Sequence, residues 1–329
     1  MVRIHLTNGK RFEANPGESL VDAAARSDIA LPYSCKTGRC STCKARIVDG
    51  VTVPMHPEFG LTAQEQEQGW ILGCVRSAES DLTLDIEDLG SVVIPKRKTV
   101  PTRIHSLQTL SSDVLKVVLR LPPTAAFDFL PGQYIDVIGP DAIRRSYSIA
   151  NGNKADGMLE LHIRKVEDGR MSSYWFGQAK ENDLLRLDGP SGTFFLRNLA
   201  GRDLVLLATG TGIAPVKAML EGLTQISEQP RSVTVYWGGR TADDLYMDFS
   251  AIPAIHRYVP VLSRADANWT GARGYVQDVY LSEAGYMDEV LVYACGSEAM
   301  IRSAKQVLTK SGLLERQFQS DAFVCSATE

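Results

Sequence analysis

Short segments in which apolar and polar residues alternate fill the middle third of the chain. They are separated by turns that contain Pro and Gly, and they span residues 114–121, 133–137, 146–150 and 159–166. Alternation with a period of two is typical of strands that bury one face. The pattern predicts an antiparallel β-barrel domain over residues 102–198.

Beyond residue 200 the pattern changes to runs of consecutive apolar residues separated by helical stretches. The runs span residues 203–208, 233–237, 258–262 and 290–295. Continuous apolar runs are typical of strands covered on both faces, and their alternation with helices is typical of a doubly wound parallel sheet. We therefore expect an α/β domain over residues 199–329.

A basic segment bracketed by two prolines, Pro95-Lys96-Arg97-Lys98-Thr99-Val100-Pro101, precedes the predicted barrel. It has no apolar periodicity, so we interpret residues 95–101 as a linker. Residues 1–94 then form a domain of their own. The fold class is therefore multidomain, with α+β and α/β parts.

Composition is that of an ordinary globular protein. Of 329 residues, 44% are hydrophobic and 22% are charged, and the net charge is −4. Without a basic field, we expect neither nucleic acid nor an anionic membrane surface as a partner. The first residues contain no apolar signal region, and no apolar stretch approaches the roughly 20 residues that cross a bilayer, so we expect a cytoplasmic protein.

Four of the six cysteines lie in the first quarter of the chain. Cys35, Cys40 and Cys43 have C-x4-C-x2-C spacing within a loop of small residues, and Cys74 follows 30 residues later. This spacing is typical of the four thiolate ligands of a plant-type 2Fe-2S cluster. A zinc site usually has two C-x2-C pairs, and disulfides do not persist in the cytosol, but both remain alternatives. The segment resembles plant-type ferredoxin domains, which implies a β-grasp fold.

A second motif, Arg145-Ser146-Tyr147-Ser148, resembles the flavin signature of the ferredoxin–NADP reductase superfamily. The resemblance implies that Arg145 binds the FAD pyrophosphate, that Tyr147 packs on the isoalloxazine ring, and that Ser148 has a catalytic position near flavin N5. Ser146 belongs to the same cofactor-binding motif. FMN remains the alternative flavin.

Two further segments, residues 161–165 and 169–173, follow at the spacing of this family. The resemblance implies that both are part of the flavin site. The Gly169–Ser173 stretch should open a helix whose free N–H groups bind phosphate oxygens. For His162 an alternative to cofactor binding stays open, because a histidine in an alternating strand can simply belong to the surface or the core. The implied cofactor-binding residues are His162, Ile163, Arg164, Gly169, Met171 and Ser172.

The apolar run that ends at residue 208 leads into Thr209-Gly210-Thr211-Gly212-Ile213-Ala214-Pro215. A glycine turn that opens a helix presents free N–H groups to a pyrophosphate. The ordinary dinucleotide fingerprint is absent, because Pro215 replaces its third glycine and no acidic residue ends the 233–237 run. The turn resembles that of the same superfamily, which implies that Thr209, Gly210, Thr211, Gly212 and Pro215 bind the pyridine nucleotide.

Two more positions take catalytic roles by the same resemblance. Cys295, followed by Gly296 in the cofactor site, places its sulfur beside nicotinamide C4 and flavin N5; the alternative is an inert buried cysteine. Phe323 covers the flavin until nicotinamide displaces it; the alternative is a residue that anchors the last strand. Arg240 and Arg264 are candidates for contacts to the adenosine half. NADH is the commoner donor in this domain order, and NADPH remains possible.

A hydride carries two electrons, whereas a 2Fe-2S cluster accepts one, so the order of carriers is NAD(P)H, FAD, cluster and partner protein. The whole chain resembles NAD(P)H-dependent iron–sulfur flavoprotein reductases. Several runs, among them residues 145–151 and 318–323, are most similar to the reductases of CDP-3,6-dideoxyhexose biosynthesis (CDP-6-deoxy-delta-3,4-glucoseen reductases), which implies a sugar dehydrase as the electron-accepting partner.

Other functions stay open at this point. Reductase components of aromatic-ring and diiron oxygenases share the same domain order, which would make an oxygenase the partner. A self-sufficient flavin-type reductase that acts on a small molecule, or a redox sensor, would be a function of another kind. No helix-turn-helix signal or basic patch supports the sensor.

Overall fold

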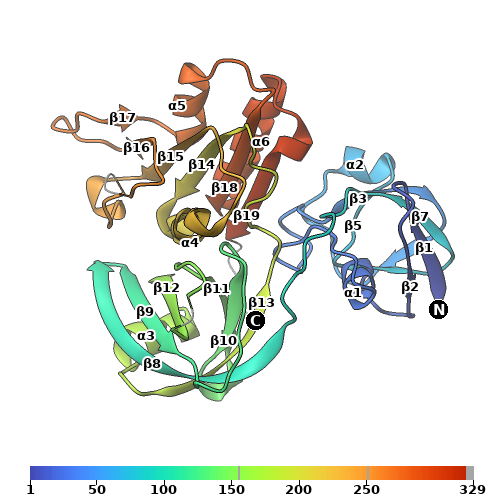
Figure 1. Cartoon of the computed structure of the whole chain (residues 1–329), viewed down its shortest axis with the longest axis horizontal. Coiled ribbons are helices and arrows are strands. Elements are labelled where there is room, and N and C mark those ends of the chain that lie inside the picture. The colour runs from blue at the N-terminus through green and yellow to red at the C-terminus, as the bar shows by residue number, and fades with distance from the viewer. Residues whose placement is uncertain (155, 250–251, 324–329) are drawn as a thin grey trace. The chain divides into compact units, whose positions relative to one another are not determined.

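The computed structural model describes residues 1–154, 156–249 and 252–323. Its described residues form two compact units, Met1–Ile94 and Pro95–Phe323. Figure 1 shows the ferredoxin-like unit in blue and the barrel and parallel sheet of the second unit in green to red.

A mixed five-stranded sheet with the order β2-β1-β7-β3-β5 forms the first unit. β1 and β7 are parallel, and the other neighbouring strands are antiparallel. A separate two-stranded sheet pairs β4 with β6. This is the expected β-grasp arrangement. The strands are β1 (Val2–Leu6), β2 (Arg11–Ala14), β3 (Lys44–Asp49), β4 (Thr52–Pro54), β5 (Trp70–Leu72), β6 (Arg76–Ala78) and β7 (Leu82–Asp85).

Two helices complete this unit, α1 (Leu20–Arg26) and α2 (Ala63–Glu67). The Ser19 hydroxyl caps α1 by accepting a hydrogen bond from the Asp22 N–H. α1 buries Leu20, Ala23 and Ala24 in the core formed with the five-stranded sheet, and its Val21 packs in a smaller cluster with Cys43 and Cys74. Because residues 34–43 contain no helix or strand, the cysteine loop depends on packing against its neighbours for its shape.

Six antiparallel strands form the barrel, in the order β11-β10-β13-β8-β9-β12. A bridge between Ile149, directly after β11, and Leu161 of β12 links the two ends of this strand order. The alternating apolar residues fill the interior, as the sequence predicts. The elements are β8 (Lys98–Ser111), β9 (Val114–Arg120), β10 (Tyr134–Ile138), η1 (Pro140–Ala142), β11 (Arg144–Ser148), β12 (Met158–Arg164), α3 (Arg170–Gly177) and β13 (Leu184–Ser191).

The segment interpreted as a linker is shorter than expected. β8 begins at Lys98, and Lys98 to Pro101 pair with Gly189 to Arg186 of β13. Val100 is buried in the barrel core. The interpretation of residues 98–101 as part of a linker was therefore wrong. A single apolar residue among basic ones shows no periodicity, and this strand is held by pairing with a segment distant in the sequence.

A six-stranded sheet with the order β17-β16-β15-β14-β18-β19 forms the remainder, and all of its strands are parallel. Successive strands are added on one side of β14 up to β17 and on its other side from β18 onward, so the strand order reverses between β14 and β18. Open α/β sheets bind their ligands at such a point. The elements are β14 (Asp203–Thr209), η2 (Gly210–Gly212), α4 (Ile213–Gly222), η3 (Leu223–Gln225), β15 (Ser232–Gly239), η4 (Ala242–Asp244), β16 (Arg257–Leu262), β17 (Ala272–Arg273), α5 (Val276–Glu283), β18 (Val290–Ser297), α6 (Glu298–Lys310), η5 (Glu315–Gln317) and β19 (Phe318–Phe323).

Candidate functional site

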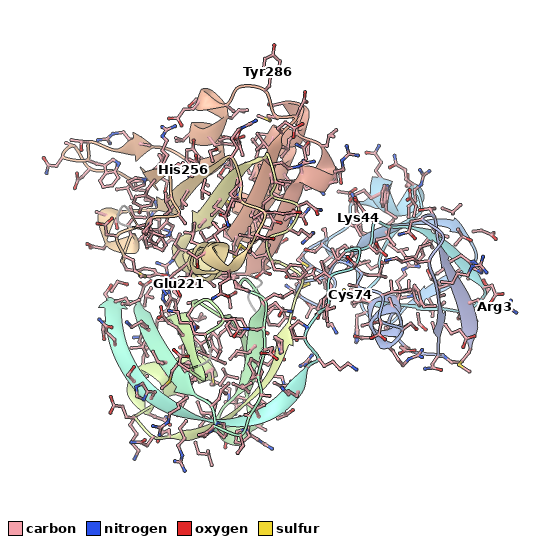
Figure 2. All side chains as sticks on the ribbon, in the orientation of Figure 1. Arg3, Lys44, Cys74, Glu221, His256 and Tyr286 are labelled. Atoms are coloured by element: carbon pink, nitrogen blue, oxygen red, sulfur yellow. The ribbon has the colours of Figure 1, made fainter. Side chains whose placement is uncertain are left out.

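The four cysteines predicted to hold a cluster come together in the first unit. Cys35 and Cys40 lie in the loop, Cys43 immediately precedes β3, and Cys74, labelled in Figure 2, lies between β5 and β6. The Cys35 N–H donates to Cys40 Sγ at 3.4 Å, and the Thr37 N–H donates to Cys35 Sγ at 3.4 Å. Main-chain N–H groups aimed at sulfur stabilise thiolates.

The sulfurs form two pairs. The hydrogen bond from Cys40 lowers the pKa of Cys35 to about 5, and the bond from Cys43 lowers the pKa of Cys74. The donating thiols, Cys40 and Cys43, have raised pKa values for the same reason. No three His, Cys, Asp or Glu side chains of the described residues are grouped around one metal position. Two pairs of thiols match a cluster of two irons, each held by two sulfurs.

A glycine shapes the cysteine loop. Gly38 has φ +74°, and a Cβ there would lie 2.4 Å from the Pro57 carbonyl oxygen. The Gly60 N–H donates to the Gly38 carbonyl at 2.9 Å. The segment around residues 57–60 therefore packs directly on the loop, at a distance that only glycine permits.

Arg145 is the arginine of the flavin motif whose charge is available to a ligand. It is half-buried, and in the described residues no carboxylate pairs with it; its guanidinium donates only to the Arg144 carbonyl oxygen at 2.8 Å. The neighbouring Arg144 instead binds Asp136 at 3.2 Å and Asp188 at 2.7 Å. An unpaired guanidinium fits a diphosphate.

The other residues of this motif differ in availability. Ser146 donates its hydroxyl to Asp136 at 2.6 Å, so this side chain is engaged within the protein. Ser148 is buried, and its hydroxyl has no partner in the described ranges. Tyr147 accepts a hydrogen bond from Trp175 Nε1 at 3.0 Å, and burial raises the pKa of Tyr147 to about 12. Ser148 thus keeps a free donor, and Tyr147 stays protonated.

The predicted helix start after Gly169 is present, since Gly169 is the N-cap of α3. The Ser172 hydroxyl accepts a hydrogen bond from the Val166 N–H at 2.9 Å. Met171 and Ile163 are buried in the barrel core, where Met171 packs on Gly139. Their side chains are therefore unavailable, and only their main-chain groups could contact a cofactor.

His162 and Arg164 join the barrel to the parallel-sheet domain. His162 contacts Glu160 at 2.8 Å and the Tyr246 hydroxyl at 3.1 Å, and burial lowers the pKa of this histidine. Arg164 donates to Asp113 at 2.7 Å and to Asp244 at 2.5 Å. The side chains of these two predicted cofactor residues thus have protein partners across the domain junction.

The glycine turn after β14 touches the end of β18 where the strand order reverses. A Cβ on Gly212 would lie 2.2 Å from the Cys295 carbonyl oxygen, and a Cβ on Gly296 would lie 2.2 Å from Thr209 Oγ1. The Ser297 N–H donates to Thr209 Oγ1 at 3.3 Å. This approach leaves free helix N–H groups and the Thr211 side chain at the carboxyl edge of the sheet.

The remaining residues of the turn help to open α4. Gly210 has φ +52°, and its carbonyl accepts a hydrogen bond from Trp237 Nε1 at 3.0 Å. Pro215 lies in the first turn of α4, where its missing N–H needs no partner. The predicted turn is therefore formed as the sequence indicates.

Cys295 and Phe323 lie on neighbouring strands. Cys295 is 0% exposed, and burial raises its pKa well above the usual range, so the thiol is neutral. It pairs in register with Asp321 of β19, while Phe323 pairs with Ser297. Phe323 is half-buried against the core of this domain. The structure therefore brings two of the three predicted catalytic residues, Cys295 and Phe323, to the carboxyl edge of the sheet.

The two arginines assigned to adenosine are adjacent. The Arg264 N–H donates to the Arg240 carbonyl at 2.9 Å, and both side chains are exposed. In the described part of the chain neither forms an ion pair. Two unpaired guanidinium groups at the ends of β15 and β16 suit an anionic ligand.

Three family models match the chain. They are a 2Fe-2S iron-sulfur cluster binding domain over residues 4–79, an oxidoreductase FAD-binding domain over 101–196, and an oxidoreductase NAD-binding domain over 206–306. The matched segments cover most of the β-grasp unit, the barrel and the parallel sheet, respectively.

Known proteins match the chain over nearly its full length. It is 42% identical to the CDP-6-deoxy-L-threo-D-glycero-4-hexulose-3-dehydrase reductase of Yersinia pestis, over 99% of this chain and 98% of that protein. The chain belongs to the iron–sulfur flavoprotein reductases. It is also 31% identical to terephthalate 1,2-dioxygenase reductase component 2 of Comamonas sp, over 96% of this chain and 95% of that protein. The solved ferredoxin reductase in carbazole 1,9a-dioxygenase has a TM-score of 0.70 and 26% identity, over 98% of both chains.

This reductase is an oxidoreductase with domains for a 2Fe-2S cluster, FAD and NAD. The predictions of fold class, enzyme class and cofactors are confirmed. FAD, not FMN, is the flavin of the matched barrel domain, and the matched first domain binds a 2Fe-2S cluster, not zinc. None of the five described cysteines is in a disulfide. No helix within the described ranges of the reductase is long and apolar enough to span a membrane.

Sequence reasoning missed three groups of residues in this reductase. Trp175 donates a hydrogen bond to the Tyr147 hydroxyl, and Lys217 forms an ion pair with Glu160. Glu58 forms an ion pair with Arg76, two residues after Cys74. Each contact joins residues distant in the sequence. No local pattern could have revealed these pairs, because their meaning depends on a partner brought close by folding.

Proposed function

We propose that this reductase takes a hydride from NADH and delivers single electrons to the dehydrase of CDP-3,6-dideoxyhexose biosynthesis. The observation that carries the choice of partner is the degree of similarity. Identity is 42% with a hexulose-3-dehydrase reductase, against 31% with reductase components of terephthalate dioxygenase, at similar coverage. The protein would then serve as a CDP-6-deoxy-delta-3,4-glucoseen reductase.

The residue assignments are part of the proposal. When bound, FAD would accept the hydride and release its electrons one at a time. Arg145 would bind the diphosphate, and the Ser148 hydroxyl would donate a hydrogen bond at the reacting edge of the flavin. Cys295 would contact the nicotinamide with an uncharged side chain, since its thiol is buried and protonated. The four thiols that form two pairs would bind the cluster: Cys35, Cys40, Cys43 and Cys74.

The nucleotide preference and the setting of the protein are proposed on separate grounds. NADH is proposed as donor because it is the commoner donor of proteins with this domain order. NADPH is proposed as a second donor because Arg240 and Arg264 offer positive charge without a carboxylate partner in the described residues. A cytoplasmic location is proposed because free thiols that bind a cluster need a reducing compartment.

The visible spectrum under anaerobic conditions, before and after addition of NADH, tests the order of carriers. We expect flavin and iron–sulfur absorption to be present together and to bleach together. In a Cys40→Ser variant, the flavin should still bleach, but transfer to a protein acceptor that takes one electron should be lost. Bleaching of the flavin alone in the wild type would instead support a self-sufficient flavin-type reductase.

Reconstitution with purified acceptors tests the partner. The reductase is mixed with NADH and either the hexulose dehydrase with its CDP-sugar substrate or the oxygenase component of a dioxygenase. We expect turnover-dependent NADH oxidation with the dehydrase. Turnover with the oxygenase alone would assign the reductase to an oxygenase system, which is the second candidate because its relatives share all three domains.

A further inference from the structure

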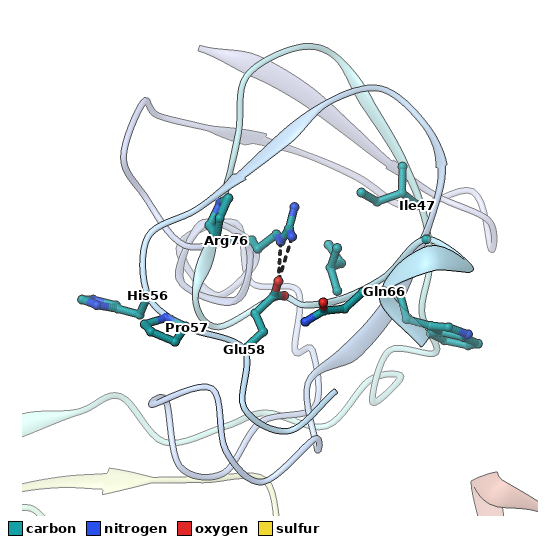
Figure 3. A pocket seen from close by; sticks show the side chains of 10 residues that line it. Ile47, His56, Pro57, Glu58, Gln66 and Arg76 are labelled. Carbon is teal, nitrogen blue, oxygen red and sulfur yellow. Dashed lines mark hydrogen bonds and ion pairs between the residues drawn. The ribbon is translucent and has the colours of Figure 1, made fainter. Parts of the chain in front are cut away.

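A buried ion pair spans the segment that carries Cys74. Arg76 donates through Nε and Nη2 to Glu58 Oε2 at 3.0 and 2.7 Å, as Figure 3 shows. The other carboxylate oxygen, Glu58 Oε1, accepts the Leu72 N–H at 2.6 Å. One carboxylate therefore holds the residue two positions before Cys74 and the residue two positions after it. The side chains of Glu58 and Arg76 are only 4% and 19% exposed.

The same pair is tied to the rest of the unit. Arg76 Nη1 donates to the hydroxyl of Thr52 at 2.9 Å, and the Met55 N–H donates to the Val75 carbonyl at 2.8 Å. Glu58 belongs to the segment that packs on Gly38 of the cysteine loop. The ion pair thus connects the loop that bears three cysteines to the segment that bears the fourth.

A pocket of about 380 Å³ lies beside the ion pair, lined by Ile47, His56, Gln66, Trp70 and others in addition to the pair itself. Space of this size means that close packing does not hold the two side chains in place from that side. Their hydrogen bonds and opposite charges must do so. A buried charge left without its partner is strongly unfavourable.

We propose that Glu58 and Arg76 are positioning residues that hold Cys74 in place as a ligand of the 2Fe-2S cluster and balance charge beside it. The proposal rests on the proposed binding of the cluster by the four cysteines. Residues two apart are within about 7 Å along the chain, so an unbalanced charge at Arg76 or Glu58 acts on the cluster at short range.

Two variants remove one charge each: Glu58→Gln, which keeps the size of the side chain, and Arg76→Gln, which shortens it. The measurements are the rate of cluster bleaching by a chelator and the anaerobic midpoint potential of the cluster. We expect both variants to lose the cluster roughly 10- to 100-fold faster, the usual effect of removing a group that supports a ligand. The potentials should move in opposite directions. Glu58→Gln leaves an uncompensated cation and raises the potential, whereas Arg76→Gln leaves an anion and lowers it.

A conservative variant adds a second measurement in case a glutamine variant folds poorly. Arg76→Lys keeps the charge but loses the planar set of donors. It should lose the cluster faster while its potential stays near that of the wild type. The matched control is Glu18→Gln, which breaks the pair of Glu18 with Arg26, whose Nε and Nη2 donate at 3.0 and 2.9 Å.

The proposal is overturned if the three variants at Glu58 and Arg76 lose the cluster no faster than Glu18→Gln. It is also overturned if the two glutamine variants shift the potential in the same direction. In both cases the wild type would still show a 2Fe-2S spectrum, so the proposed function would stand. A wild type without that spectrum after reconstitution with iron and sulfide would reject the proposed cluster binding itself, and this proposal with it.

Discussion

Two neighbouring arginines on β11 show how much the role of a residue depends on what surrounds it. Arg144 is neutralised by Asp136 and Asp188, whereas Arg145 has no carboxylate partner in the described residues. Alternation along the strand directs them to opposite sides. The charge of Arg145 is therefore available to an anionic ligand, and that of Arg144 stabilises the barrel.

This difference predicts the effect of replacing each arginine. Arg145→Ala should weaken FAD binding roughly 10- to 100-fold, because hydrogen bonds to charged groups contribute about 1.5–3 kcal/mol and about 1.4 kcal/mol is a factor of ten. Arg144→Ala should leave FAD affinity within a few fold. The measurement is the dissociation constant of FAD after deflavination. Equal losses in both variants would contradict the assignment of Arg145.

Gly212 is a second position at which a single atom decides the geometry. Its Cβ would lie 2.2 Å from the Cys295 carbonyl oxygen, so Gly212→Ala forces the glycine turn away from the end of β18. We expect the kcat/KM for NADH to fall about 100-fold, the usual cost of a misplacement near 1 Å, with FAD content unchanged.

Gly177→Ala is the control for this change. Gly177 ends α3, and a Cβ there meets nothing within 4 Å. Its NADH kinetics should match those of the wild type. Stopped-flow reduction of the flavin by NADH measures both variants. A normal rate in Gly212→Ala would show that the close approach of the glycine turn to the end of β18 is not needed.

At the scale of elements, the outer face of β12 connects two domains. Glu160 accepts hydrogen bonds from His162 and Lys217, and Lys217 of α4 also binds Glu221, labelled in Figure 2, at 2.7 Å. The inner face of the same strand fills the barrel core. One strand therefore supports both the barrel and its junction with the parallel sheet, which keeps the flavin and nucleotide motifs together.

This junction predicts a dependence of stability on pH. Burial raises the pKa of Glu160, but the hydrogen bond from His162 and the charge of Lys217 together outweigh it and hold this pKa at about 2, against 4.5 for a free glutamate. The carboxylate therefore stabilises the fold above about pH 4.5 by at most about 3 kcal/mol, and this contribution is lost as the pH falls from 4.5 towards 2. The lowered pKa of His162 acts in the same direction, since protonation below pH 6.5 favours the unfolded chain.

Thermal unfolding of the wild type and of Glu160→Gln between pH 7 and pH 3 tests this prediction. The wild type should unfold at the higher temperature at pH 7, and the difference should shrink as the pH falls below about 4.5. A difference that stays constant over this range would mean that the ionised carboxylate does not stabilise the junction.

At the scale of the whole molecule, the described residues form two compact units, and the boundary along the sequence lies between Ile94 and Pro95. The flavin and nucleotide motifs both lie in the second unit, and the cysteines lie in the first. Arg97, just after the boundary, forms ion pairs with Asp136 and Asp188 of the barrel. The acceptance of hydride and the release of single electrons are thus assigned to separate units.

A shortened chain that begins at Pro95 tests this division. We expect it to bind FAD and to reduce ferricyanide with NADH at a rate near that of the full chain, but not to reduce a protein acceptor. A chain that begins at Lys98 also lacks Arg97 and should be less stable by at most about 1 kcal/mol per lost pair, since the arginine is partly exposed. Failure of the longer fragment to bind FAD would show that the second unit depends on the first.

Much of this protein could be inferred from the sequence because its signals are local. The spacing of Cys35, Cys40 and Cys43 lies within one loop, the strand patterns have a period of two, and the glycine turn follows its strand directly. Residues 98–101 were interpreted as a linker, whereas in the structure they form a strand that pairs with β13. The order of the domains and the classes of cofactor therefore followed from the chain alone.

The tertiary structure decided which side chains are available and which are engaged. Arg144 and Asp188 are 44 positions apart, and Arg76 and Glu58 are 18 apart, so no local pattern distinguishes a paired arginine from a free one. His162 and Arg164 match the motif, yet each also has a partner in the parallel-sheet domain, Tyr246 for His162 and Asp244 for Arg164. Charge and hydrogen bonding act through space, so the sequence determined which chemical groups are present, and folding determined which of them can meet a ligand.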